Sequence, residues 1–184
     1  MIELPAFLDN FKELEDYAKK AKYEDEVNPV DGVVYPCICK DIPERVMNDL
    51  IYCLTFKILQ RRPKDPFVFL RRSPEGVPVP HKFHTDHSMG DFSMMIYLQD
   101  NHNAGTGLAI HKEMGISRAP DNPEQLNKAI EDCNDDSKWQ IYKIAEMMKN
   151  KAVIFDSQLF HVALPIGGFG EGKESRTVLT CFFS

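Results

Sequence analysis

The feature that most limits the fold is a series of short strand-like segments after Arg62-Pro63. Each segment is apolar or alternates apolar with polar residues, and turn-forming residues separate it from the next. Short strands at this spacing are typical of an antiparallel sandwich or barrel. The segments are 67–71, 79–85, 92–99, 106–111, 139–146, 152–156, 161–165 and 176–183.

The first third of the chain has a different, mainly helical pattern. Apolar residues recur at helical spacing from Phe7 to Ala21, residues 32–40 resemble a strand, and Pro43 opens a second helix that includes Ile58. No linker or low-complexity tract separates this part from the strands. We therefore expect one domain over 1–184: residues 1–65 form a helical support packed outside a β core of residues 66–184.

Composition excludes several functional classes. The chain of 184 residues carries a net charge of −6, which argues against a binder that neutralises nucleic-acid phosphates. Its longest apolar runs, such as Met94 to Leu98, are far shorter than the ~20 residues that cross a bilayer. The five cysteines form no CxxC pair, and the N-terminus lacks the basic and apolar stretches of a secretory signal. We expect a cytoplasmic protein.

Basic residues gather in one stretch of this acidic chain. They could meet an anion, but a solvated basic face is the interpretation we favour from sequence. The six are Lys57, Arg61, Arg62, Lys64, Arg71 and Arg72.

The segment from His81 to His87 carries the first chemical signal. On an extended strand His84 and Asp86 face the same side, so their side chains could hold one ion together. A third candidate, His161, opens a later apolar strand. Two imidazoles and one carboxylate form a facial triad that leaves coordination positions open, which suits non-haem Fe(II). A closed zinc site favours cysteine ligands, and no cysteine lies close in sequence to these histidines.

A buried strand also begins with an arginine. Arg176 precedes the apolar run that ends at Phe183. A guanidinium there needs water or an anion, and its planar fork matches a carboxylate of a small ligand. The alternative is a strand-end arginine in solvent.

Taken in order, five landmarks resemble those of the Fe(II)- and 2-oxoglutarate-dependent dioxygenases, and most of all the prolyl-4-hydroxylase-like branch. The resemblance covers about residues 66–184 and implies a double-stranded β-helix, or jelly roll, with the metal at the mouth of the barrel. The landmarks are His84-x-Asp86, Tyr97-Leu-Gln, Gly105-Thr-Gly-Leu-Ala-Ile, Phe155-Asp-Ser with His161, and Arg176.

The resemblance also implies roles. His84, Asp86 and His161 would bind Fe(II), and Arg176 would pair with the distal carboxylate of 2-oxoglutarate, with Tyr97 as a further hydrogen-bond donor. The implied reaction consumes 2-oxoglutarate and O2, releases succinate and CO2, and hydroxylates a C–H bond. The expected substrate is a peptidyl residue, proline-like, on a protein. A free amino acid or another small molecule is the alternative, and a nucleic acid is not expected.

Two other classes of protein remain open. One is a non-catalytic jelly-roll module that binds metal. The other is an enzyme with a different ion held by His84, His87 and His161. We interpret His81, His102 and His111, like His87, as structural or surface residues, and Trp139 as a core anchor. The acidic 121–136 insertion is expected to be a short helix or a loop, and the 167–172 stretch resembles a hairpin loop. No role follows for these two segments or for the 73–82 loop.

Overall fold

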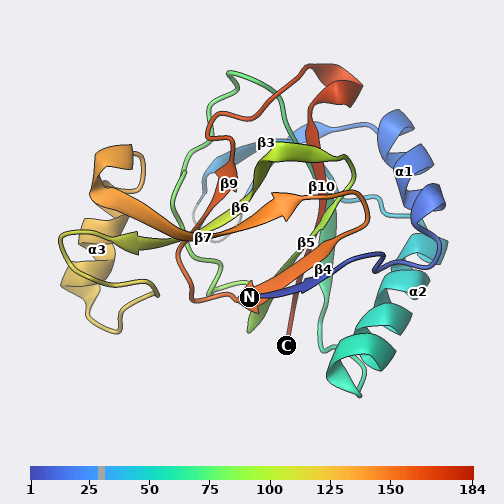
Figure 1. Cartoon of the computed structure of the whole chain (residues 1–184), viewed down its shortest axis with the longest axis horizontal. Coiled ribbons are helices and arrows are strands. Elements are labelled where there is room, and N and C mark those ends of the chain that lie inside the picture. Colours follow the sequence, from blue (N-terminus) through green and yellow to red (C-terminus); the bar gives the residue numbers. More distant parts are fainter. Residues whose placement is uncertain (29–31) are drawn as a thin grey trace.

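Two antiparallel sheets form the centre of the molecule (Figure 1). The computed structural model describes residues 1–28 and 32–184. The larger sheet has the order β1-β8-β5-β10-β4-β3-β2, and the smaller one the order β7-β6-β9. The strands are β1 (Ile2–Leu4), β2 (Glu24–Val27), β3 (Val34–Cys39), β4 (Phe67–Ser73), β5 (Phe92–Tyr97), β6 (Asn101–His111), β7 (Trp139–Met147), β8 (Ala152–Asp156), β9 (His161–Leu164) and β10 (Arg176–Phe183).

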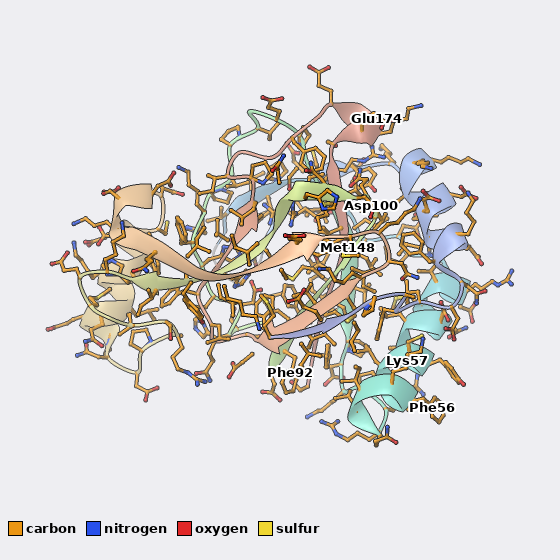
Figure 2. The ribbon with its side chains drawn as sticks, viewed as in Figure 1. Phe56, Lys57, Phe92, Asp100, Met148 and Glu174 are labelled. Atoms are coloured by element: carbon orange, nitrogen blue, oxygen red, sulfur yellow. The ribbon has the colours of Figure 1, made fainter. Side chains whose placement is uncertain are left out.

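Helices cover the outside of the sheets. Figure 1 shows α1 and α2 on one side of the larger sheet and α3 at the opposite end of the molecule. Phe56, 62% exposed, marks the outer surface of the segment that continues α2 (Figure 2). The helices are α1 (Phe11–Lys20), α2 (Glu44–Cys53), the π-helix η1 (Leu54–Leu59), α3 (Pro123–Glu131), and the 3-10 turns η2 (Asp136–Lys138) and η3 (Gly172–Glu174). The expected class, mainly β with flanking helices, is confirmed.

Strand β10 lies at the centre of the larger sheet and is buried along its whole length. Leu179 and Cys181 pack with the helices in one core cluster. Val178, on the other face, packs with residues of the smaller sheet in a second cluster. Because side chains alternate along a strand, Arg176 shares the inner face with Val178. The space between the two sheets is therefore where a buried site can form.

The first 65 residues differ from the expected helical support. Strand β3 confirms the strand expected over 32–40, whereas β1 and β2 were not expected. The three strands extend the larger sheet at both edges: β1 pairs with β8, β2 with β3, and β3 with β4. The change from helices to strands therefore does not fall at residue 65, and the single domain over 1–184 stays a prediction. Tertiary pairing decides these edge strands, since a short strand has little local signal of its own.

The expected strand over 79–85 is also wrong. In the structure this segment is a loop, with one isolated bridge between His84 and His161. Pro78 and Pro80 have no backbone N–H to donate to a sheet, which explains why no regular strand forms here.

The acidic insertion forms α3. Asn122 caps it by accepting a hydrogen bond from the backbone N–H of Glu124, and Pro123 occupies the first turn. The core role expected for Trp139 is confirmed, because this side chain is buried and stacks on Phe83. Within the described part of the chain, no helix is both long enough and apolar enough to cross a membrane. The cytoplasmic location stays a prediction.

Candidate active site

Three of the sequence-predicted residues meet at one point between the sheets. Nε2 of His161 lies 3.2 Å from Oδ2 of Asp86, and Nε2 of His84 lies 3.7 Å from Oδ1 of the same carboxylate. Donor atoms of the three residues all lie within 4.8 Å of one another. This spacing allows one ion to contact all three.

The backbone builds this cluster in a way that differs from the sequence interpretation. His84 and His161 exchange two backbone hydrogen bonds, of 3.1 and 2.9 Å between nitrogen and oxygen. Asp86 lies in the loop that follows, where its backbone N–H donates to the carbonyl of Ser157 at 2.8 Å. Long-range contacts to the β8–β9 segment, rather than alternation along a strand, therefore bring His84 and Asp86 together.

Hydrogen bonds orient each ligand atom. Nδ1 of His84 lies 3.1 Å from the carbonyl of Lys82, and Nδ1 of His161 lies 3.0 Å from that of Leu159. A proton on each Nδ1 satisfies these carbonyls and leaves Nε2 as a lone-pair donor. The hydroxyl of Ser93 donates to Oδ2 of Asp86 at 2.9 Å, which fixes the carboxylate.

The charges of the three groups fit a divalent metal. Burial, with a contribution from His161, lowers the pKa of His84 to about 4, so this imidazole is neutral at physiological pH. Burial works to raise the pKa of Asp86, but His161, with smaller contributions from His84 and the hydroxyl of Ser93, outweighs it and holds the pKa below its usual range. The same contact with Asp86 raises the pKa of His161 despite its burial. Nε2 of His161 is buried and makes no hydrogen bond of normal geometry, although Oδ2 of Asp86 lies 3.2 Å away. A metal ion would satisfy this orphaned atom, and two nitrogens with one carboxylate are a donor set that Fe(II) accepts.

A cavity of about 900 Å³ opens beside the three residues. His84 and Asp86 lie in its wall, together with the guanidinium of Arg71. Most of the remaining wall is apolar and comes from the larger sheet, from α3 and from the adjoining loops. It includes Val27, Ile38, Phe67, Phe69, Phe83, Met89, Leu126, Ala129, Ile130, Phe160 and Phe182.

Arg176 and Tyr97 lie outside the lining of this cavity, deeper between the sheets. Arg176 donates through one terminal nitrogen to the carbonyl of Gly105 at 3.0 Å, while its Nε is buried without a partner. The hydroxyl of Tyr97 donates to Oγ1 of Thr106 at 2.7 Å. Burial lowers the pKa of Arg176 to about 10 and raises that of Tyr97 to about 12, so both keep their protons at neutral pH. The alternative of a solvated strand-end arginine is wrong.

Sequence reasoning missed Arg71, which it had placed on a solvated basic face. The side chain turns inward and lines the cavity, whereas Arg72 turns to the other face and stacks over Tyr23, 3.9 Å from its ring centre. The alternation with Phe67 and Phe69 carried the missing signal, because residues two apart share one face of a strand.

The other histidines stand apart from the cluster. His87 is exposed, and its Nδ1 lies 2.7 Å from the hydroxyl of Thr85. His111 is buried, with Nε2 3.0 Å from Oδ2 of Asp132, and His81 lies 3.4 Å from the sulfur of Cys133. The cluster of candidate ligands therefore includes Asp86 rather than His87.

Comparisons with known proteins support the fold. No family model matches the chain, and no curated protein does. Among solved structures, the non-haem α-ketoglutarate-dependent epimerase SnoN from nogalamycin biosynthesis is similar with a TM-score of 0.55 at 12% identity, over 98% of this chain and 76% of that one. EvdO2 from Micromonospora carbonacea var. aurantiaca is similar with a TM-score of 0.52 at 13% identity, over 98% and 84%. The chain has the fold of these two proteins. These similarities do not confirm the expected prolyl-4-hydroxylase-like branch.

Proposed function

We propose that this protein is an Fe(II)- and 2-oxoglutarate-dependent oxygenase on a double-stranded β-helix, and that it hydroxylates a small molecule. The observation that carries the proposal is the cluster of His84, Asp86 and His161 at the wall of an apolar cavity, with the buried Nε2 of His161 making no hydrogen bond of normal geometry. Three ligands leave half of an octahedral coordination sphere for co-substrate and oxygen.

When bound, Fe(II) supplies the redox chemistry that couples decarboxylation of 2-oxoglutarate to oxidation of a C–H bond. The overall reaction balances: 2-oxoglutarate, O2 and R–H give succinate, CO2 and R–OH. The chain's own residues hold the geometry. Ser93 fixes the carboxylate of Asp86, and the carbonyls of Lys82 and Leu159 set the two imidazole rings. The apolar wall keeps water from the reacting bond.

The role proposed for Arg176 is to bind the distal carboxylate of 2-oxoglutarate. Its guanidinium is held on the inner face of β10, and the unpartnered Nε is a donor for an anion. Tyr97, opposite Val178 on the same face, is the proposed second donor. A small-molecule substrate is preferred over the peptidyl proline expected from sequence, because SnoN, one of the two similar structures, is described as an epimerase from nogalamycin biosynthesis.

The test combines metal binding with turnover. We expect Mn(II) to bind the native protein in calorimetry, and 2-oxoglutarate to bind the Mn(II)-loaded form. Asp86→Ala should lose both, because an uncompensated pair of imidazoles is a much weaker site. His87→Ala is the matched control and should keep both; the reverse pattern would favour the ion site of His84, His87 and His161.

With Fe(II), native protein should release succinate as O2 is consumed, even without the substrate. Tight binding of Mn(II) and 2-oxoglutarate without any succinate would instead identify a non-catalytic binding module. Absence of metal binding by the native protein would refute the proposed function itself.

A further inference from the structure

Arg71 is a charged side chain in the apolar cavity that the proposed chemistry does not use. It lies on β4 opposite Val178 of β10 and Ile38 of β3, and its side chain lines the cavity with His84 and Asp86. The guanidinium is close enough to the His84–Asp86–His161 cluster for its charge to act on the pKa values of both histidines. Arg71 therefore belongs to the space in which a substrate would react.

The surroundings leave this guanidinium short of partners. Its Nε is buried and has no hydrogen-bond partner. Among the described residues no ion pair joins Arg71 to a carboxylate; Asp86, in the same cavity wall, acts on the pKa of Arg71 through its charge without a direct contact. The ring of Tyr35 is 5.8 Å from the guanidinium carbon, a cation–π contact that brings no negative charge to Arg71. An arginine keeps its charge when buried, so an anionic ligand would offset the cost of holding it here.

An apolar wall lies directly beside the charge. Phe69, two residues before Arg71 on the same face of β4, is roughly 7 Å away along the strand. Its ring centre lies 5.4 Å from that of Phe67 and 6.0 Å from that of Phe182. Leu126 and Ile130 of α3 contribute apolar surface to the same cavity. Lys40 also lines the cavity, but its charge is paired with Glu26 at 2.6 Å. The cavity thus presents the guanidinium of Arg71 beside a broad apolar surface.

The carboxylates of 2-oxoglutarate are the competing ligands for Arg71. The two arginines occupy different places, however: Arg176 is two residues from Val178, the residue opposite Arg71, and lies outside the cavity lining. Arg71 faces the open cavity, which is the space left for a substrate once the co-substrate is bound. The deeper guanidinium suits a co-substrate that binds first, and the one at the cavity wall suits a ligand that binds second.

We propose that Arg71 binds the carboxylate of the substrate, and that the substrate is a small carboxylic acid whose apolar or aromatic body packs against Phe67, Phe69 and Phe182. This inference rests on the proposed function, because it takes the metal cluster as the reacting centre. It assigns a substrate class, an apolar monocarboxylate, and a specificity residue that sequence alone placed in solvent.

The experiment uses matched pairs of acids and primary amides as probes. Hexanoate, 3-phenylpropionate and 4-phenylbutyrate, each with its amide, are titrated into protein loaded with Mn(II) and 2-oxoglutarate. Ligand proton NMR measures affinity, and line broadening by Mn(II) shows whether the probe lies near the metal. In native protein we expect at least one acid to bind about tenfold or more tightly than its amide, because a charge-assisted pair is lost in the amide.

Variants on one strand provide the control. Arg71→Gln should abolish the preference for the acid, and Arg71→Lys should keep part of it. Arg72→Gln should leave the preference intact, since Arg72 points to the other face and donates to the carbonyl of Ala18. Calorimetry with 2-oxoglutarate should give the native affinity in all three variants.

Three results would overturn the inference: no acid binds native protein more tightly than its amide, the preference survives in Arg71→Gln, or Arg71→Gln weakens 2-oxoglutarate binding while acid binding is unchanged. Failure of the proposed function looks different, because Mn(II) and 2-oxoglutarate would then not bind native protein at all. In that case the acid and amide titrations on unloaded protein still test Arg71.

Discussion

Two buried guanidinium groups face the interior of this molecule, and their neighbours differ. Arg176 is enclosed and donates to the carbonyl of Gly105, whereas Arg71 lines an open cavity beside His84 and Asp86. Desolvation of each guanidinium is costly, and a bound anion would offset that cost at either position. At the scale of single residues, we therefore propose that Arg176 binds the co-substrate and that Arg71 binds the substrate.

Replacing Arg176 tests whether this side chain binds the co-substrate. In Arg176→Ala we expect the affinity of the Mn(II)-loaded protein for 2-oxoglutarate to fall about 10- to 100-fold, because a charge-assisted hydrogen-bonding partner is lost. Mn(II) affinity should stay unchanged, since the metal ligands are untouched. Calorimetry measures both, and Arg176→Lys should recover part of the loss. An unchanged 2-oxoglutarate affinity in Arg176→Ala would show that this assignment is wrong.

At the scale of elements, the glycine-rich 167–172 stretch sets the start of β10. Its backbone bonds to the end of β4, where Phe169 donates to the carbonyl of Ser73 at 3.2 Å and Gly170 accepts from Glu75 at 2.9 Å. The backbone N–H of Arg176 donates to the carbonyl of Phe169 at 3.1 Å. The loop that was expected as a hairpin connection therefore also positions the arginine that follows it.

Gly168 is the critical residue of this loop. Its φ is +75°, and a Cβ there would lie 2.3 Å from the carbonyl oxygen of Ser73. We expect Gly168→Ala to lower the free energy of unfolding by about 2 to 4 kcal/mol, because the cost of the positive φ and the cost of the Cβ clash with the Ser73 backbone are added together. Gly167→Ala is the matched control: φ is +92° but nothing lies within 4 Å, so we expect about 1 kcal/mol. Urea unfolding measures both, and equal losses would contradict the clash.

Helix α1 is tied to the turn between β7 and β8. Glu15 forms ion pairs with Lys149 in that turn and with Lys19 in its own helix, the latter at 3.2 Å. The backbone N–H of Lys149 also donates to Asp100 at 2.8 Å, and Figure 2 shows Asp100 and Met148 at this end of the sheets. The helix and the turn thus depend on each other through charge.

This contact predicts a pH dependence. Hydrogen bonds from Lys149 and Lys19 lower the pKa of Glu15 despite some desolvation, so the ionised carboxylate stabilises the fold above its unfolded pKa near 4.5. The contribution is lost as pH falls through the lower, folded pKa. Glu15→Gln should therefore destabilise the fold by up to about 1 kcal/mol at neutral pH, and this loss should shrink as the pH falls below about 4.5. Urea unfolding of both proteins over a series of pH values checks this; a constant difference would contradict it.

At the scale of the whole molecule, the site joins segments that are far apart in sequence. The loop after β4 supplies His84 and Asp86, β9 supplies His161, β4 supplies Arg71, and β10 supplies Arg176. A metal that contacts both the loop and β9 therefore links parts of the chain that otherwise meet through two backbone hydrogen bonds.

Metal binding should accordingly stabilise the entire fold. A ligand that binds the native state at 100 times its Kd adds about 2.7 kcal/mol, so Mn(II) with 2-oxoglutarate should raise Tm by several degrees. Asp86→Ala should show no such rise, and His87→Ala should show the native rise. Differential scanning calorimetry measures the shifts. A native Tm that is indifferent to Mn(II) would argue against a preformed site.

Much of the β core follows from local pattern. The segments at 67–71, 92–99 and 152–156 became β4, β5 and β8, because alternating or uniformly apolar runs bury one or both faces of a strand. The segment at 79–85 did not form a strand, since its prolines remove backbone donors. The strands β1 and β2 escaped prediction because their pairing with distant partners, not their own composition, holds them in place.

The amino-acid sequence by itself determined the strand-rich class, the residue types able to bind a metal, and a positive charge at the head of β10. These follow from period, composition and side-chain chemistry, which are local properties. The tertiary structure alone decided that His161 meets His84 and Asp86, that Arg71 faces the cavity, and that Arg176 lies behind it. Such meetings depend on which strands pair and in what register, and long-range packing sets that register.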